Sequence, residues 1–336
     1  MVDPDRLGWN DRRASEMPPG EDLVPARVAV EHRGAYDLLG MGDDLAEGAR
    51  VSADLRDRAS GRLDFPAVGD WVAVRPGAGP RGADLIEAVL PRTSLFVRRA
   101  PGRDPRPQVV GTNIDTVFIA TSLDGDLNPR RLERYLAVVH GGDAEPVVLV
   151  TKTDLVSEGR ELDRARALVA SVAPGVEVVP TSVTTGEGLD RLVELIPEGR
   201  TAALVGSSGV GKSTIVNAMM GREVQQVAPT RADGRGRHTT VTRDLLLLPG
   251  GGLVVDTPGM REVQLWEGTG LDLVFPEIAA RARECRFADC RHISEPGCEV
   301  RAAVERGEIA AERLASRHRL EEELEELRGE LEERGR

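Results

Sequence analysis

Eight consecutive residues constrain the fold of this 336-residue chain more than any other feature. Residues 206–213 read Gly-Ser-Ser-Gly-Val-Gly-Lys-Ser and match the pattern of a phosphate-binding loop, GxxxxGK[ST]. An apolar run at 201–205 precedes the loop, and a stretch with helical character at 212–220 follows it. Backbone N–H groups of such a loop turn toward phosphate oxygens at the N-terminus of a helix. The pattern therefore predicts a nucleotide site on a parallel α/β sheet.

The side chains of this loop have distinct predicted roles. We expect Lys212 to bridge the β- and γ-phosphates and the hydroxyl of Ser213 to ligate Mg²⁺. The other predicted contacts of the loop come from Gly206, Ser207, Ser208, Gly209, Val210, Gly211 and Thr214. The alternative, a Gly-rich turn with an incidental lysine, is disfavoured because the whole pattern and both flanking elements are present.

Two segments that precede the loop indicate which base is bound. Residues 151–154, Thr-Lys-Thr-Asp, resemble the Asn/Thr-Lys-x-Asp motif with which GTPases bind guanine. The Asp154 carboxylate can accept hydrogen bonds from two guanine N–H groups that adenine lacks, while the stem of Lys152 would cover the base. Residues 181–183 resemble a Ser-Ala-x loop, in which the backbone N–H of Val183 would meet the guanine carbonyl oxygen. The two segments together favour guanine over adenine, with further contacts expected from Thr151, Thr153 and Ser182.

Two segments after the loop have the character of switches. Asp256-Thr-Pro-Gly resembles an Asp-x-x-Gly motif, in which Asp256 would hold Mg²⁺ through water and the Gly259 amide would sense the γ-phosphate. Residues 234–241 are Gly-rich and basic and carry paired threonines, so they are interpreted as the first switch. Either Thr239 or Thr240 would reach Mg²⁺, and the sequence leaves that choice open.

The order of these motifs is circularly permuted. An ordinary GTPase runs from the phosphate loop through the switches to the base motifs, whereas here the base motifs come first. The sheet is unchanged if its old ends are joined near residue 200 and new ends are cut after the second switch. Met260 follows that switch, and a thioether cannot orient attacking water as the glutamine of many GTPases does. His238 is then the candidate catalytic group, with an ordinary surface histidine as the alternative.

The flanking regions predict a multidomain protein. Residues 1–22 are expected to form a flexible arm because they offer little to bury. Residues 23–105 hold short apolar runs between turns, without a convincing helix, and predict a barrel or sandwich whose strands cover 25–30, 36–39, 49–55, 70–74, 85–89 and 94–97. An OB-like, oligonucleotide-binding barrel and a purely structural β-module fit this pattern equally well. Alternating strands and helices assign residues 106–265 to the α/β GTPase domain.

Residues 266–336 are predicted to form an α-helical zinc module. Cys285, Cys290, His292 and Cys298 are close in sequence, and three thiolates with one imidazole make a closed tetrahedral shell for one structural Zn²⁺. Buried free thiols beside a chance histidine are the alternative. The acidic C-terminal helix carries an apolar stripe of Leu320, Leu324, Leu327 and Leu331. A packing face against the chain's own core is favoured over a partner-binding face or a short coiled coil.

Charge and composition exclude some functions. A formal net charge of −12 argues against a diffuse positive field that coats nucleic acid. Local basic patches at 92–106 and 231–243 remain available for a nucleic acid. We find no export signal and no run of the roughly 18–20 apolar residues that span a bilayer. We therefore expect a cytoplasmic protein with reduced thiols, no membrane partner and a monomeric state.

Taken together, these features resemble the RsgA/YjeQ family of circularly permuted bacterial GTPases. The resemblance covers roughly residues 24–320 and includes Val-Gly-Asp-Trp-Val at 68–72, Asn-Ile-Asp-Thr-Val-Phe-Ile at 113–119, Leu-Glu-Arg-Tyr-Leu at 132–136 and Arg-His-Thr-Thr at 237–240. It departs at Val183, where relatives carry Ala, and at Thr151, where most carry Asn. Thr151 cannot supply both an amide donor and a carbonyl acceptor, so we expect a weaker link between the base loop and the phosphate loop.

The resemblance implies an oligonucleotide-binding barrel and hydrolysis of GTP to GDP and phosphate. It also implies that the small ribosomal subunit and its rRNA are the partners, that the subunit stimulates hydrolysis, and that the protein acts late in maturation of that subunit. The alternative is a nucleotide-gated RNA- or protein-binding module with negligible hydrolysis. Met260 keeps this alternative open.

Overall fold

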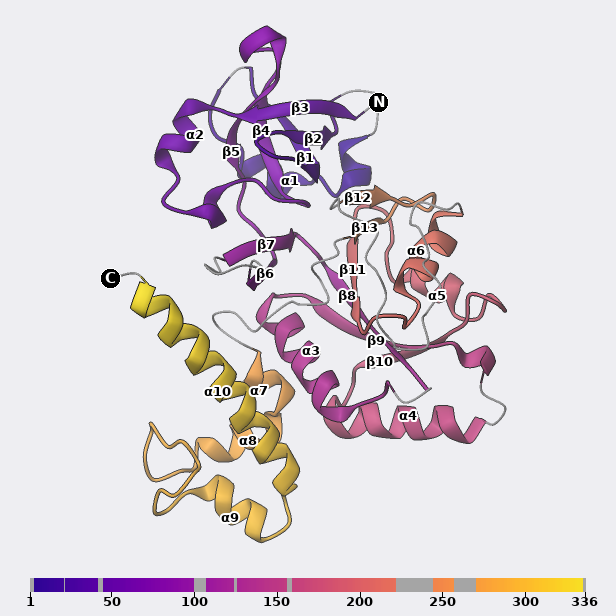
Figure 1. Ribbon diagram of the computed structural model, residues 1–336, viewed down its shortest axis with the longest axis vertical. Helices are drawn as coiled ribbons and strands as arrows, with labels where there is room; N and C mark the ends of the chain where they lie inside the picture. Colours follow the sequence, from indigo (N-terminus) through magenta and orange to yellow (C-terminus); the bar gives the residue numbers. More distant parts are fainter. Residues whose placement is uncertain are drawn as a thin grey trace.

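The computed structural model describes residues 3–20, 22–41, 45–99, 107–123, 126–155, 159–221, 244–256 and 270–334. Its main sheet has the strand order β10-β9-β8-β11-β13-β12-β1-β2-β3-β5-β4. Figure 1 shows a barrel above, an α/β domain at the right and a helical module below. The predicted architecture of barrel, permuted α/β domain and C-terminal helical module is confirmed.

The barrel closes through two neighbours of its first strand. Its strands are β1 (Val24–Glu31), β2 (Tyr36–Leu39), β3 (Ala46–Val51), β4 (Trp71–Arg75) and β5 (Leu85–Val89). β1 pairs with both β2 and β4, and β3 pairs with β5, so the five strands form a ring. Small and β-branched residues fill the interior, and Ala26, Val28, Leu38, Val72, Val74 and Ile86 are fully buried. Closure removes the free edges that an open five-stranded sheet would expose.

Two predictions within the barrel region are wrong. The expected strand at 49–55 ends at Val51, because the Ser52 hydroxyl accepts a hydrogen bond from the Leu55 N–H and caps helix α2 (Ala53–Arg58). The last expected strand, β6 (Leu95–Arg99), pairs with β7 (Pro107–Thr112) in a separate hairpin rather than with the barrel. That hairpin spans the predicted domain boundary at residue 105. Short turns η2 (Arg62–Asp64) and η3 (Pro80–Gly82) complete the region.

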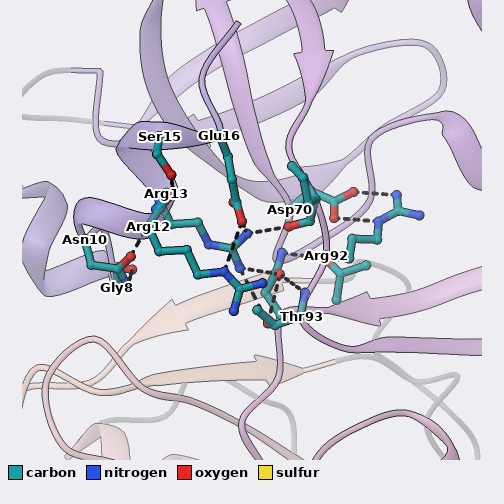
Figure 2. Close-up of polar contacts among 12 residues, drawn as sticks. Gly8, Asn10, Arg12, Arg13, Ser15, Glu16, Asp70, Arg92 and Thr93 are labelled. Carbon is teal, nitrogen blue, oxygen red and sulfur yellow. Dashed lines mark hydrogen bonds and ion pairs between the residues drawn. The ribbon is translucent and has the colours of Figure 1, made fainter.

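The interpretation that the first 22 residues have nothing to bury is also wrong for their described part. This segment forms η1 (Pro4–Leu7) and α1 (Asp11–Ser15). Leu7 is fully buried, and the Trp9 ring lies 4.9 Å from that of Trp71 between centroids. Arg13 donates to the Pro91 carbonyl and, at 2.8 Å, to Asn113 Oδ1 (Figure 2). Isolated anchors of this kind leave no apolar run in the sequence, so composition alone does not reveal them.

The α/β domain presents its motif-bearing strand ends at one edge. Its parallel strands are β8 (Thr116–Ser122), β9 (Glu145–Thr151), β10 (Glu177–Thr181), β11 (Thr201–Gly206) and β13 (Leu253–Asp256). β12 (Asp244–Leu247) pairs antiparallel with β13 and joins β1 of the barrel through Val30 and Asp244. The helical elements are α3 (Pro129–Gly141), η4 (Thr153–Leu155), α4 (Gly159–Val172), α5 (Leu189–Glu194) and α6 (Lys212–Met220). Residues of α3 and α4 pack on one face of the sheet, and residues of α5 and α6 pack on the other.

The C-terminal module packs against α3, and ion pairs such as Arg313–Glu133 and Arg134–Glu323 join α10 to α3. It contains α7 (Leu271–Val274), α8 (Pro276–Ala282), α9 (Glu299–Glu305) and α10 (Ala311–Arg334). Leu320 and Leu324 are buried in the main core, which confirms the packing face for these two residues; the side chains of Leu327 and Leu331 lie outside the described part. Among the described residues no helix is both long and apolar enough to cross a membrane.

Candidate nucleotide and metal sites

The phosphate loop connects β11 to α6, as the pattern predicts. Gly206 has φ 138°, and a Cβ there would lie 2.3 Å from the carbonyl oxygen of Ala120 on the neighbouring strand β8. Gly211 precedes α6 with φ 106°, in the left-handed region that glycine adopts without strain. These two glycines let the chain leave a buried strand and enter a helix within a few residues.

Lys212 spans this loop. Its Nζ donates to the carbonyl oxygens of Gly206 at 2.7 Å and of Ser207 at 2.6 Å. The ammonium group therefore lies over the turn in which a phosphate-binding loop holds its anion, next to the positive end of α6. Ser213 and Thr214 are half-buried in the first turn of the same helix.

The two base motifs meet at the ends of β9 and β10. The Ser182 hydroxyl donates to Asp154 Oδ1 at 2.6 Å. That hydrogen bond is the main reason why the pKa of Asp154 is lowered from its ordinary value, so the exposed carboxylate is ionised at neutral pH. Thr153 donates to Glu187 at 2.5 Å, and Ser182 N–H donates to the Glu187 carbonyl, which ties the two segments together a second time.

Thr151 links the base motif to the phosphate loop. Its side chain is 2% exposed, and its hydroxyl lies 2.7 Å from the Val210 carbonyl oxygen and 3.2 Å from that of Thr121. One hydroxyl proton serves these two acceptors. The link between the base loop and the phosphate loop, which we expected to be weaker with Thr than with Asn at position 151, is therefore present and depends on a single donor. Lys152, the next residue, has φ 59°, which turns the chain sharply away from the strand.

One residue at the loop was missed by sequence reasoning. The Arg131 guanidinium, in the first turn of α3, contacts both Ser207 Oγ in the phosphate loop and the Asp126 carboxylate. Ser207 is 76 residues away in the chain. The signal lay in topology, because β8 and β11 are neighbours and the helix that follows β8 must begin beside the loop that follows β11.

Only part of the predicted switch chemistry falls on described residues. Asp256 ends β13, the neighbour of β11, and thus lies at the same sheet edge as Ser213. The other predicted groups, Gly259, Met260, His238, Thr239 and Thr240, lie outside the described residues.

The four predicted zinc ligands converge. Their donor atoms all lie within 4.8 Å of one another, with Cys285 Sγ 3.6 Å from His292 Nδ1, His292 Nδ1 3.4 Å from Cys298 Sγ, and Cys285 Sγ 4.0 Å from Cys298 Sγ. A tetrahedral Zn²⁺ shell has S–S edges of about 3.8 Å and S–N edges of about 3.5 Å, which follow from its bond lengths. The residues therefore fit this ion. Burial and the neighbouring thiols raise the pKa of Cys290 to about 11, so metal binding must displace that proton.

Glu295 organises the zinc loop and was not singled out from the sequence. Its carboxylate accepts backbone hydrogen bonds from Arg291, Ile293 and Ser294 at 2.9–3.0 Å. A hydrogen bond from its own backbone N–H, followed by these three, lowers the pKa of Glu295 to about 2, and the bonds hold the turn in which His292 has φ 60°. The turn directs the imidazole toward the thiols.

The prediction that Arg92 belongs to a partner-binding basic patch at 92–106 is wrong. This guanidinium pairs with both oxygens of buried Asp70 at 2.8 and 2.7 Å (Figure 2). It also donates to the Leu63 carbonyl at 2.6 Å. Only 14% of its side chain is exposed. Arg92 therefore holds the barrel together and does not offer its charge to a partner. Arg98 of the same patch donates to Gln108 Oε1 at 3.0 Å, whereas the side chain of Arg99 and residues 100–106 and 222–243 lie outside the described part.

This combination of fold and site defines a class: base motifs at the ends of β9 and β10, followed in sequence by a phosphate loop on β11 of the same sheet, make a circularly permuted GTPase. The profile of the RsgA GTPase family matches residues 89–266. A relative from Opitutus terrae named small ribosomal subunit biogenesis GTPase RsgA is 45% identical over 329 residues, covering 94% of this chain and 88% of the relative. The chain therefore belongs to the RsgA GTPase family, enzymes that hydrolyse GTP.

Solved structures agree with this assignment. YjeQ from Thermotoga maritima aligns with TM-score 0.66 and 27% identity, over 90% of this chain and 98% of that one. YloQ, titled a circularly permuted GTPase, aligns with TM-score 0.64 and 24% identity over 91% and 96% of the two chains, which shows the fold alone. The resemblance inferred from the sequence is confirmed.

Proposed function

We propose that this protein hydrolyses GTP to GDP and phosphate, that the small ribosomal subunit stimulates this reaction, and that it acts late in maturation of the subunit. The name of the Opitutus relative supports the partner. The observation that carries the nucleotide part is that the Asp154–Ser182 pair and the loop spanned by Lys212 both follow the carboxyl ends of strands in one parallel sheet. A site at the carboxyl ends of parallel strands is where α/β proteins bind nucleotides.

Each described residue has a specific task in this proposal. Asp154 accepts from guanine, Ser182 keeps that carboxylate ionised and oriented, and Thr151 fixes its distance from the phosphate loop. Lys212 stabilises negative charge on the β- and γ-phosphates. Ser213 and Asp256 would hold Mg²⁺, which neutralises charge that develops on the phosphate oxygens when it is bound.

The remaining residues of the proposed site come from the sequence. Thr151 to Asp154, Ser182, Val183 and the loop from Gly206 to Thr214 contact GTP. Thr239 or Thr240 completes the magnesium shell, Gly259 senses the γ-phosphate, and His238 orients water in place of Met260. Without a glutamine at Met260 we expect slow turnover in isolation.

We further propose one structural Zn²⁺ per chain, held by Cys285, Cys290, His292 and Cys298. The short distances between their donor atoms support it. The proposed units are an N-terminal segment 1–22, a barrel 23–105 that contacts rRNA, a GTPase domain 106–265 and a zinc module 266–336, acting as a cytoplasmic monomer. The contacts of Arg13 with the Pro91 carbonyl and of Trp9 with Trp71 support treating those first two units as one body.

Phosphate release with purified small subunits tests the function. We expect slow GTP hydrolysis alone, strong stimulation by subunits, and little cleavage of ATP. Met260 keeps open the alternative of a nucleotide-gated binding module. Binding of GTP with negligible hydrolysis in the presence of subunits would support that alternative. Equal cleavage of ATP and GTP would contradict the proposed base site.

A further inference from the structure

Ser207 of the phosphate loop is held from two sides by cations. Its backbone carbonyl accepts from Lys212 Nζ at 2.6 Å, and its hydroxyl contacts the guanidinium of Arg131. The two cations are thus separated by no more than one residue and two hydrogen bonds. The sequence motif accounts for Lys212, whereas nothing in the motif accounts for Arg131.

Arg131 is poorly placed for helix stability. It lies in the first turn of α3, after Pro129 at the first helical position and Asn128 at the cap. A cation there faces the positive end of the helix dipole, which disfavours it. The Asp126 carboxylate compensates that charge and orients the guanidinium toward the loop. The contact with Ser207 is therefore the feature that distinguishes Arg131 from an ordinary surface arginine.

The helix that carries Arg131 is firmly fixed. Glu133, 3% exposed, accepts from Arg313 at 2.7 Å and from the Ser316 hydroxyl, both on α10. Arg134 pairs with Glu323 of the same helix at 2.7 Å. Because α3 is clamped one turn beyond Arg131, the guanidinium has a stable base from which to hold the loop.

We propose that Arg131 is a positioning residue of the GTPase reaction, which acts on Lys212 through Ser207. By holding the Ser207 hydroxyl, it fixes the carbonyl oxygen that orients the lysine ammonium toward the β- and γ-phosphates. Charge on those phosphates grows in the transition state, so a misplaced ammonium lowers kcat more than it lowers ground-state binding. This inference rests on the proposed role of the loop as the GTP phosphate site.

Variants of the full-length protein test it. The Arg131 side chain is 42% exposed, so its loss costs little stability and Arg131→Ala should fold. Losing a charge-assisted hydrogen bond of about 1.5–3 kcal/mol corresponds to roughly a tenfold to hundredfold effect, and partial exposure favours the lower end. We expect Arg131→Ala to lower kcat about tenfold, with KM for GTP and the Kd for GDP changed less than twofold. Arg130→Ala, an exposed neighbour, is the matched control and should behave as wild type.

A double-mutant cycle identifies the route. Ser207→Ala should lower kcat by a similar factor, and the double variant should lose no more than either single variant, because both remove the same link. Arg131→Lys should restore only part of the rate, because it keeps the cation but its shorter, more flexible side chain holds the Ser207 hydroxyl less rigidly. Additive effects, a kcat equal to that of Arg130→Ala, or an equal loss of GDP affinity would each overturn the inference. A wild-type protein that fails to hydrolyse GTP would instead count against the proposed function.

Discussion

The nucleotide edge of the sheet and the junction between barrel and sheet both depend on polar side chains, with different environments. At the nucleotide edge, Asp154 is exposed and Lys212 is half-buried, and both follow the carboxyl ends of parallel strands. At the junction, Arg27 is 2% exposed and donates to Leu7 O at 2.6 Å, Thr201 Oγ1 at 2.8 Å, Asn113 O at 3.1 Å and Gly69 O at 3.2 Å. Burial lowers the pKa of Arg27 to about 10, so it stays charged at neutral pH.

This difference separates function from stability. Exposed side chains at the nucleotide edge can be removed with little loss of folding stability, because water can solvate the polar groups that they leave behind. Arg27 joins the N-terminal segment, the barrel and the strand that leads into the phosphate loop, so its removal leaves buried acceptors unsatisfied. The two regions are connected by β11, which carries Thr201 at one end and the loop at the other.

The largest expected effect is on catalysis. Lys212→Ala should lower kcat on the order of a hundredfold to a thousandfold, since it removes the cation aimed at the transferred phosphoryl group. The melting temperature should change little. Phosphate release and thermal unfolding measure the two effects, with Arg164→Ala on an exposed face of α4 as the control. Near-normal turnover in Lys212→Ala would remove the lysine from the site.

The opposite outcome is expected at the junction. Arg27→Ala should lower the free energy of unfolding by about 3 kcal/mol or more, because the carbonyl oxygen of Leu7 and its neighbours lose a charged donor. Activity per folded molecule should be retained. Urea unfolding of this variant, compared with Arg12→Ala, whose side chain is 66% exposed, makes the measurement. If Arg27→Ala were as stable as Arg12→Ala, the buried hydrogen bonds of Arg27 would not be a main source of folding stability.

The zinc module provides a third, local effect. Cys290→Ser should reduce the zinc content from about one ion per chain and increase amide exchange across residues 285–298, while GTP affinity stays within twofold. A closed shell supplies much of the stability of such short loops. Elemental analysis and hydrogen exchange measure this, with Asp289→Asn as the control in the same loop. A wild-type protein that is free of zinc and still protected from exchange would contradict the metal assignment.

The smallest effect is expected at Thr151. Thr151→Val keeps the volume but removes the donor to Val210, and loss of one neutral hydrogen bond of about 1 kcal/mol weakens GTP binding roughly fivefold. Titration calorimetry should show that the affinities for GTP and GDP fall by the same factor, because the Thr151–Val210 link does not depend on contacts with the γ-phosphate. Thr151→Ser retains the hydroxyl and should bind as wild type. Unchanged affinity in Thr151→Val would mean that the two loops hold their spacing without it.

The nucleotide edge was predictable because its chemistry is local in sequence. The phosphate loop, Asp154 and the zinc ligands each fall in short patterns, and the parallel sheet follows from the alternation of strands and helices. Composition offered a further signal: only two of the 44 basic residues are lysines, Lys152 and Lys212, and both lie in nucleotide motifs. Every other basic residue is an arginine, so these two lysines are the positions at which the sequence retains a side-chain ammonium group.

The junction was not predictable, for a physical reason. Leu7, Arg13 and Arg27 are stabilised by partners far away in the chain, and Arg13 alone reaches residues 78 and 100 positions distant. A buried arginine and an exposed one look the same in a sequence window. The same limit led to Arg92 being assigned to a basic patch, although Asp70 holds it in the barrel.

Exchange of the base provides the most direct test that the permuted motifs form one guanine site. Asp154→Asn replaces two acceptor oxygens by one acceptor and one donor, which suits xanthine rather than guanine. We expect binding and hydrolysis to shift from GTP to xanthosine triphosphate, by roughly tenfold or more in each direction, with the fold unchanged. Competition binding and phosphate release with both nucleotides, for the wild type and the variant, make the measurement. An Asp154→Asn protein that still prefers GTP would show that this carboxylate does not recognise the base.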